Sequence, residues 1–154
     1  MWKGYGNAPS PTSDFHIHHR LVSTVASGPI AQSHLRVSYL SINCTAWQAC
    51  RTFYEALGVT FVQEEHPGVP LHLSADVGGA VLELHGPAAR GGAVGRGLRL
   101  GFDVADVHAA ADALVAAGGV LQRAPAYGPW GLRAVVIDPD GRRVELTGPS
   151  RDPR

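Results

Sequence analysis

The chain has 154 residues, of which 45% are hydrophobic and 17% charged, so it can form one globular domain with an ordinary core. Thirteen Lys and Arg balance thirteen Asp and Glu, which leaves no net basic charge to attract nucleic acid. No apolar run approaches the roughly 20 residues that a membrane-spanning helix needs. We therefore expect a soluble protein with neither nucleic-acid nor membrane partners.

The two cysteines, Cys44 and Cys50, do not stand in a CxxC or Cys/His zinc spacing. We interpret them as buried free thiols of a reducing compartment. The stretch from 21 to 26 is too short and too polar to be the apolar part of a secretory signal. Together these features predict a cytoplasmic protein.

The first 34 residues are rich in Gly, Pro, Ser and Thr and lack apolar periodicity, which is typical of a flexible tail. This tail contains His16, His18 and His19, but a flexible segment offers no fixed geometry for a metal ion. Residues 150–154 are predicted to form a second, short tail. The folded domain is therefore expected to cover residues 35–149.

The domain is predicted to begin with a strand and a helix. Alternation of side chains from Val37 onward indicates a strand whose core face carries Leu40, Ile42 and Cys44. Apolar residues at helical spacing then indicate a helix over about 46–57, with Thr45 as its N-cap and Gly58 as its end. Three strands follow, at about 59–64, 70–75 and 79–85, the last two joined by a turn at Gly78 and Gly79.

The second half of the chain repeats this order. It is predicted to contain a strand at 98–104, a helix at about 106–117, and strands at 120–123, 131–137 and 142–147. Residues 76–87 align with residues 138–149 at a constant offset of 62, and six of these twelve positions are identical. We predict an α+β fold in which two βαβββ modules, at about 37–87 and 97–149, form a curved mixed sheet around a cleft.

Four polar residues occupy equivalent positions of the two modules. Glu83 matches Glu145 near the end of the last strand, and Tyr39 matches Arg99 on the first strand. If the inner faces of the modules meet, these four side chains converge and form a candidate site. An alternative is that Arg99 pairs with both glutamates and satisfies them internally, without any ligand.

Several segments of the chain together resemble a known family. They are Phe53-Tyr54-Glu-Ala-Leu57-Gly58, Phe102-Asp-Val104-Ala-Asp106, Gly128-Pro-Trp130-Gly131, and Asp138-Pro139-Asp140-Gly141 through Glu145-Leu146. In this order and spacing they resemble the vicinal oxygen chelate superfamily, which includes glyoxalase I, bleomycin-resistance and fosfomycin-resistance proteins, and extradiol dioxygenases. The resemblance covers roughly residues 35–149 and implies a homodimer that binds a small organic ligand.

In metal-using members of that family, the resemblance implies four ligands, at Tyr39, Glu83, Arg99 and Glu145 of this chain. Tyr is a poor ligand at neutral pH, and Arg has no lone pair to donate. His85 could complete a set with Glu83 and Glu145 for one divalent Fe, Mn, Ni, Zn or Co ion, with His72 in support. The alternative interpretation is that His72 and His85 are surface residues at strand ends.

The departures at two ligand positions favour the metal-free members of the family, and we expect no cofactor. In this hypothesis the protein sequesters a drug-like or natural-product ligand, as in antibiotic resistance. Arg99 pairs with a ligand anion, and Tyr39 and Glu145 form hydrogen bonds. The ligand's rings stack on Tyr127, Trp130 or Trp47, unless Trp130 packs under its own loop.

The alternative hypothesis is an enzyme of the same family. It would be a lyase, isomerase or dioxygenase in which Glu83 and Glu145 hold a metal ion that polarises paired substrate oxygens. Without a metal, Glu145 or Tyr39 would move a proton.

Overall fold

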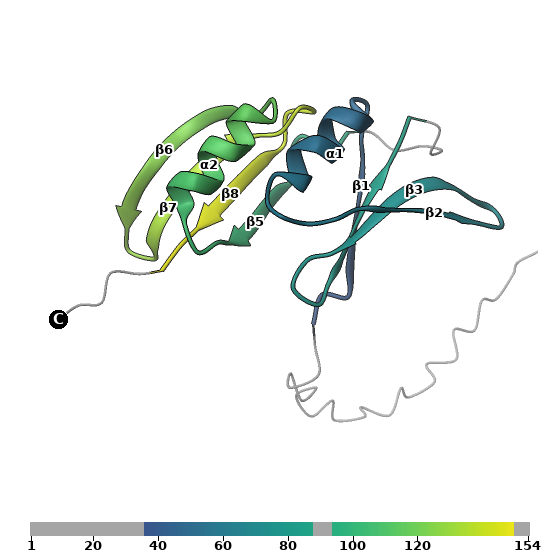
Figure 1. Ribbon diagram of the computed structural model, residues 1–154, viewed down its shortest axis with the longest axis horizontal. Helices are drawn as coiled ribbons and strands as arrows, with labels where there is room; N and C mark the ends of the chain where they lie inside the picture. Colours follow the sequence, from purple (N-terminus) through teal and green to yellow (C-terminus); the bar gives the residue numbers. More distant parts are fainter. Residues whose placement is uncertain (1–35, 88–93, 150–154) are drawn as a thin grey trace, which may run out of the picture. The chain divides into compact units, whose positions relative to one another are not determined.

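The computed structural model describes residues 36–87 and 94–149 (Figure 1). The two predicted tails and the histidines at 16, 18 and 19 lie outside these residues. Within them, no helix is long and apolar enough to cross a membrane, since α1 has nine residues and α2 has ten.

The first module contains one helix and a four-stranded mixed sheet. Its elements in chain order are β1 (Tyr39–Asn43), α1 (Trp47–Glu55), β2 (Val62–His66), β3 (Val69–Asp76) and β4 (Val81–His85). The strand order is β1-β4-β3-β2, in which β1 runs parallel to β4 and the other pairs are antiparallel. We call this sheet A.

The second module repeats this arrangement. Its elements are β5 (Arg99–Asp103), α2 (Val107–Ala116), β6 (Val120–Gly128), β7 (Gly131–Ile137) and β8 (Arg143–Thr147). The strand order is β5-β8-β7-β6, again with one parallel and two antiparallel pairs, and we call this sheet B. The α+β class and the two βαβββ modules are confirmed, with the strands divided into one sheet for each module. The strand predicted at 120–123 is longer than expected and extends to Gly128.

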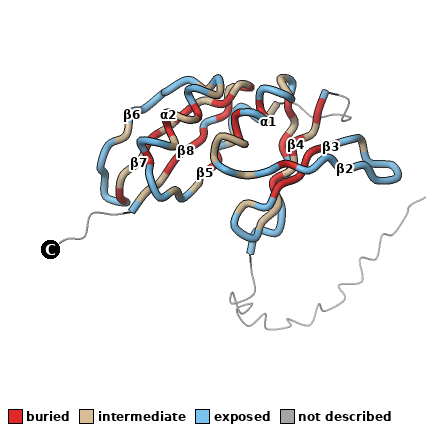
Figure 2. The backbone as a smooth tube through the Cα atoms, viewed as in Figure 1, coloured by how far each residue is buried: buried red, intermediate tan, exposed pale blue. Residues whose placement is uncertain are grey.

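Each module buries one face of its sheet against the core (Figure 2). The predicted core face of β1 is confirmed, because Ile42 and Cys44 are buried and Leu40 is partly buried. The last strands behave alike in the two modules and bury Leu and Val at alternate positions. Each helix adds three buried residues: Cys50, Phe53 and Tyr54 from α1, and Val107, Ala111 and Leu114 from α2.

The two helices begin differently. Asp106 caps α2, and its Oδ1 accepts hydrogen bonds from the backbone N–H of His108 at 2.9 Å and of Ala109 at 3.1 Å. The prediction that Thr45 is the N-cap of α1 is wrong, because Ala46 holds that position without a side-chain cap. The Thr45 hydroxyl instead donates to Asp140 of the second module at 2.5 Å.

A buried network of polar groups joins the modules around Arg142, which is fully buried. Arg142 donates to Asp138 at 2.5 Å and to the backbone carbonyl of Asn43. Asp138 also accepts from the Tyr54 hydroxyl at 2.8 Å. Asp140 accepts from the backbone N–H of Thr45 at 2.9 Å. The Asp-Pro-Asp-Gly segment that carried the family resemblance forms the turn after β7, and its carboxylates bind this turn to the start of α1.

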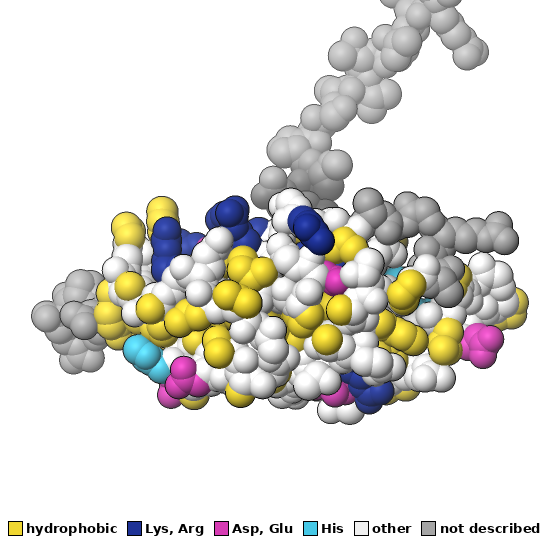
Figure 3. Space-filling view, turned by 90° about the horizontal axis from the view of Figure 1, so that it is seen from above, with side chains coloured by type: hydrophobic (Ala, Val, Ile, Leu, Met, Phe, Trp, Pro, Cys, Tyr) yellow, Lys and Arg dark blue, Asp and Glu magenta, His cyan; other side chains and the backbone are white. Residues whose placement is uncertain are grey.

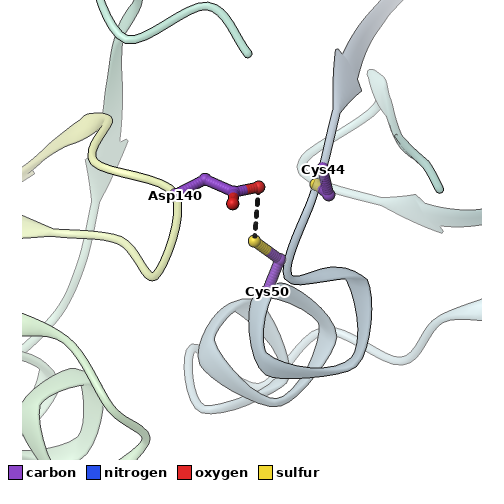
Figure 4. Close-up of side chains that lie close together, drawn as sticks. All are labelled: Cys44, Cys50 and Asp140. Atoms are coloured by element: carbon purple, nitrogen blue, oxygen red, sulfur yellow. Dashed lines mark hydrogen bonds between the residues drawn. The ribbon is translucent and has the colours of Figure 1, made fainter. Parts of the chain in front are cut away.

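Both cysteines lie beside this network. Each is buried and unpaired, as predicted from the sequence. The Cys50 thiol donates to a carboxylate oxygen of Asp140 at 3.4 Å (Figure 4). The neighbouring Cys44 sulfur, burial and the negative charge of Asp140 raise the pKa of Cys50, so this thiol stays protonated.

Candidate functional site

The candidate site lies on the face of sheet B that is turned away from the core. In β8, Val144 and Leu146 are buried, so Arg143 and Glu145 point to the opposite face. The parallel register places Arg99 beside Arg143 and Gly101 beside Glu145. Alternation and register together therefore put Arg99, Arg143 and Glu145 on one outer face.

This outer face contains a hollow of about 350 Å³. Its lining residues all come from the strands of the second module, namely Arg99, Gln122, Arg123, Val135, Arg143 and Glu145. Three guanidinium groups surround a single carboxylate, so the net charge of the lining is positive. Figure 3 shows Lys and Arg side chains gathered along one edge of the face that it presents. The hollow is therefore suited to an anionic group.

The Glu145 carboxylate is held between two arginines. One oxygen forms an ion pair with Arg133, and the other lies 4.0 Å from Nη1 of Arg99. The Glu145 side chain is only 16% exposed, whereas that of Arg99 is 59% exposed. Arg99 therefore makes the looser contact and has room to turn toward a ligand.

A second hollow of about 380 Å³ adjoins the first and shares Glu145 with it. Its other lining residues are Trp130, Arg133 and Thr147. Arg133 lies over the Trp130 ring, with Cζ 5.4 Å from the ring centroid, in a cation–π contact. Trp130 is 71% exposed, which rules out the alternative that it packs under its loop.

The two other predicted aromatic residues differ in their surroundings. Tyr127 lies in β6, is 51% exposed and pairs in register with Leu132. Trp47 packs against the core, and its indole N–H donates to the Leu84 carbonyl at 3.2 Å. The structure does not bring Trp47 to either hollow of sheet B.

In the first module, Tyr39 and Glu83 share the outer face of sheet A, because Tyr39 pairs with Val81 and Ser41 pairs with Glu83. Tyr39 is 63% exposed. Glu83 lies 3.2 Å from Nε2 of His85.

His85 in turn stacks on His72, with ring centroids 4.8 Å apart. The interpretation of His72 as a surface residue is wrong, because it is 3% exposed. His72 lies inside β3 (Val69–Asp76), between β2 and β4, rather than at the end of its strand.

The four equivalent residues are brought together only in part. Among the described residues, the Glu145 carboxylate pairs with Arg99 and Arg133, whereas the Glu83 carboxylate contacts His85. The internal cluster predicted for Arg99 with both glutamates thus forms with Glu145 alone. A hollow of about 440 Å³ lies between the modules, but it is lined by Leu57, Val59, Val77, Gly78 and residues 101–104.

A metal ion at the positions used by metal-binding relatives does not fit these side chains. Arg99 occupies one ligand position, and it and Arg133 both place a cation on the Glu145 carboxylate. In the described part of the chain, groups of three or more ligand side chains within 4.8 Å are Cys44, Cys50, Asp140 and Glu64, His66, His72. Neither group contains Glu83 or Glu145.

Three arginines of the site were not singled out from the sequence: Arg123, Arg133 and Arg143. Arg133 could have been found, because it is the one charged residue of the strand predicted at 131–137, and a charged side chain there is expected to face away from the core. Arg123 could not, because irregularities in the pairing of β6 and β7 break the alternation around it.

The fold and the site define a two-module α+β protein with a ligand-sized, positively charged hollow on one sheet. The chain belongs to the Glyoxalase/Bleomycin resistance protein/Dioxygenase superfamily, whose family model matches residues 36–146.

Solved structures of the same fold include an antibiotic binding protein, TnmS3 from Streptomyces sp. CB03234. It is 25% identical to this chain, with a TM-score of 0.61, and the match covers 77% of this chain and 98% of that one. A glyoxalase-related enzyme from Fulvimarina pelagi is 27% identical, with a TM-score of 0.60 and coverage of 74% and 88%. No curated protein matches the chain.

Proposed function

We propose that the protein binds a small organic molecule that carries an anionic group and an aromatic ring, and that it sequesters this molecule without an orthodox metal site. The observation that carries the proposal is the hollow on sheet B, where Arg99, Arg123 and Arg143 surround one carboxylate. A guanidinium presents two parallel N–H donors to a carboxylate or phosphate, which gives both strength and orientation.

Not every arginine of this face is equally available. Arg133 is paired with Glu145, and Nε of Arg143 donates to the Gln122 side chain at 3.1 Å. Within residues 36–87 and 94–149, the charged partner of Arg99 is Glu145 at 4.0 Å, and the Arg99 side chain is mostly exposed. We therefore assign Arg99 the main role in pairing with the ligand anion, and Glu145 the role of a hydrogen-bond acceptor beside it.

The adjoining hollow supplies the aromatic surface. Trp130 is held by its cation–π contact with Arg133 while one face of the ring remains accessible. A ligand ring stacked on Trp130 would place an attached anion in the first hollow, toward Arg99, because the two hollows adjoin at Glu145. Tyr127, on the strand before this loop, is a further candidate wall.

The family contains both binders and enzymes, so the fold alone does not decide between them. The positive charge around Glu145 opposes a metal ion there, which removes the chemistry that metal-using relatives employ. The likeness to TnmS3, an antibiotic binding protein, supports a natural-product-like ligand. A cytoplasmic location remains a prediction from the sequence.

We retain the homodimer as part of the proposal. Tyr39 lies in the edge strand β1, on the outer face of sheet A, and is 63% exposed. A second copy that covers this edge would bury its ring and bring Tyr39 to a ligand. Light scattering after size-exclusion chromatography tests this point, and a monomer at high concentration would contradict it.

The binding test compares aromatic carboxylates with their uncharged primary amides by titration calorimetry. We expect a carboxylate to bind, and the R99A variant to weaken it about ten- to hundredfold, since a hydrogen bond to a charged group contributes about 1.5–3 kcal/mol. The R51A variant, which removes a partly exposed arginine of α1, serves as the matched control. Equal affinity for acid and amide, or no effect of R99A on any ligand found, would disprove the assigned role.

A further inference from the structure

The outer face of sheet A carries a cluster that the proposed function does not use. Glu64 of β2, His66 at the end of β2 and His72 of β3 direct their polar atoms to one point, and all three ligand atoms lie within 4.8 Å of one another. We infer that Glu64, His66 and His72 form a binding site for a divalent transition-metal ion of the zinc type. This site is separate from the four positions at which metal-using relatives are expected to hold their ion.

Local strand geometry produces the cluster. Glu64 lies directly opposite His72 in the antiparallel pair of β2 and β3. The register then shifts, so that His66 pairs with Val69 and the β3 side of the pair holds one extra residue. Pro70 lies in this bulge, where its missing N–H does no harm. Because His66 follows Glu64 by two positions, it projects to the same face.

The distances suit a shared ion better than direct hydrogen bonds. Oε2 of Glu64 lies 3.5 Å from Nε2 of His66 and 3.6 Å from Nε2 of His72. Hydrogen bonds between nitrogen and oxygen are about 2.7–3.2 Å long. Ligands about 2.0–2.2 Å from a tetrahedral zinc ion are separated by roughly 3.3–3.5 Å. Both distances from the Glu64 carboxylate to the imidazoles are therefore close to those of a zinc coordination shell.

The buried histidine is oriented for this role by its second ring nitrogen. Nδ1 of His72 lies 3.1 Å from the Pro70 carbonyl, which can only accept a hydrogen bond. Nδ1 therefore carries a proton, and in the neutral ring Nε2 has the free lone pair that a metal ion requires. A backbone carbonyl that fixes the tautomer of a histidine in this way is the usual outer contact of a metal-binding histidine.

The surroundings of the cluster also favour a cation. Glu83 lies 3.2 Å from His85 next to the three ligands, so this face of sheet A carries a second carboxylate beside that of Glu64. His85 stacks on the buried ring of His72 and limits its movement. The side chains of His66 and Glu64 are 58% and 40% exposed, so an ion can enter from solvent.

The ligand set selects the kind of ion. Two imidazoles and one carboxylate suit Zn²⁺ and similar transition metals, whereas Mg²⁺ and Ca²⁺ prefer oxygen ligands. The other described ligand group, Cys44 with Cys50 and Asp140, already has the Arg142 guanidinium 3.3 Å from its carboxylate, which disfavours a metal ion there. Three protein ligands leave one position open for water.

The test measures binding of Zn²⁺ and Co²⁺ to the full chain. Because His16, His18 and His19 could also bind metal, the reference protein is the H16A/H18A/H19A variant. We expect it to bind one Zn²⁺ per chain by calorimetry, and Co²⁺ to give the strong visible absorption of a tetrahedral site. Adding H66A should weaken Zn²⁺ binding at least tenfold, whereas adding H108A, which removes an exposed histidine of α2, should leave it unchanged.

His66 is the informative position because it is exposed, so its loss should not unfold the protein, and circular dichroism checks this. E64Q keeps the size of the side chain and should also weaken binding at least tenfold. Two results would overturn the inference: no Zn²⁺ bound above background in the H16A/H18A/H19A protein, or binding there that neither H66A nor E64Q reduces.

Discussion

Arg142 offers the sharpest test of how the two modules are held together. Its guanidinium is fully buried and pairs with Asp138 at 2.5 Å and with Asp140 at 3.3 Å. The R142M variant keeps a side chain of similar length but leaves two carboxylates in the core without their cation. Removing one partner of a buried ion pair costs about 3–5 kcal/mol. Since domains of this kind are stabilised by about 5–15 kcal/mol, we expect R142M to lose a large part of its stability.

The assay is urea denaturation followed by circular dichroism, with free energies of unfolding extrapolated to water. The matched control is R51M, because Arg51 pairs with Glu55 on the exposed side of α1, and such pairs contribute about 0.3–0.5 kcal/mol. Adding D138N and D140N to R142M should recover part of the loss, because the unpaired negative charges are removed. A loss below about 1 kcal/mol for R142M would refute the argument that this network carries much of the stability.

Two further predictions concern the same domain. A methyl group at Gly119 would lie 2.6 Å from Cε2 of Phe53 and 2.7 Å from Cγ1 of Val136, so G119A should lower the free energy of unfolding by about 1–3 kcal/mol, while G101A, which meets nothing within 4 Å, should not. Thermal denaturation distinguishes these variants, and equal melting temperatures would contradict the packing argument. Burial opposes ionisation of Asp140, but hydrogen bonds from Thr45, Ala46 and Cys50 outweigh it and lower the pKa of this carboxyl. Because the folded pKa is depressed, the stability that this carboxylate contributes is present above the unfolded pKa of about 3.9 and is lost as the pH falls through the folded pKa. The free energy of unfolding of D140N, measured at a series of acid pH values, should therefore fall less steeply with pH than that of the unmodified protein.

The fold could be predicted from the sequence because both halves of the chain show the same order of strand and helix patterns. Alternation in the strands and the helical spacing of Phe53 and Tyr54 fixed the core faces, and both of these residues are fully buried. The glycines at 78 and 79 have positive φ values of 73° and 87°, as the predicted turn requires. Such signals are local, so each can be interpreted without knowing the tertiary structure.

The candidate site was harder to predict from the sequence than the fold. Counting along the repeat identified equivalent positions such as Glu83 and Glu145, but equivalence does not establish contact, and their ion pairs lead to different partners. Thr45 has the composition of an N-cap, yet its hydroxyl serves Asp140, which is 95 residues away in the sequence. His72 was predicted to lie at the surface because the pattern of a strand does not show that the His85 ring stacks on it. Each of these outcomes depends on contacts between elements that are distant in the chain.

The outer faces of the two modules differ in charge, and this difference separates the two proposed sites. The register places His72 beside His85 in sheet A and Arg133 beside Thr147 at the corresponding positions of sheet B. The outer face of sheet A thus presents carboxylates and imidazoles, whereas that of sheet B presents guanidinium groups around Glu145. The outer face of sheet B attracts an anion and repels a cation, whereas the outer face of sheet A attracts a cation and leaves an anion unpaired. The two kinds of ligand should therefore bind independently, so that H66A leaves the affinity for an aromatic carboxylate unchanged and R99A leaves Zn²⁺ binding unchanged.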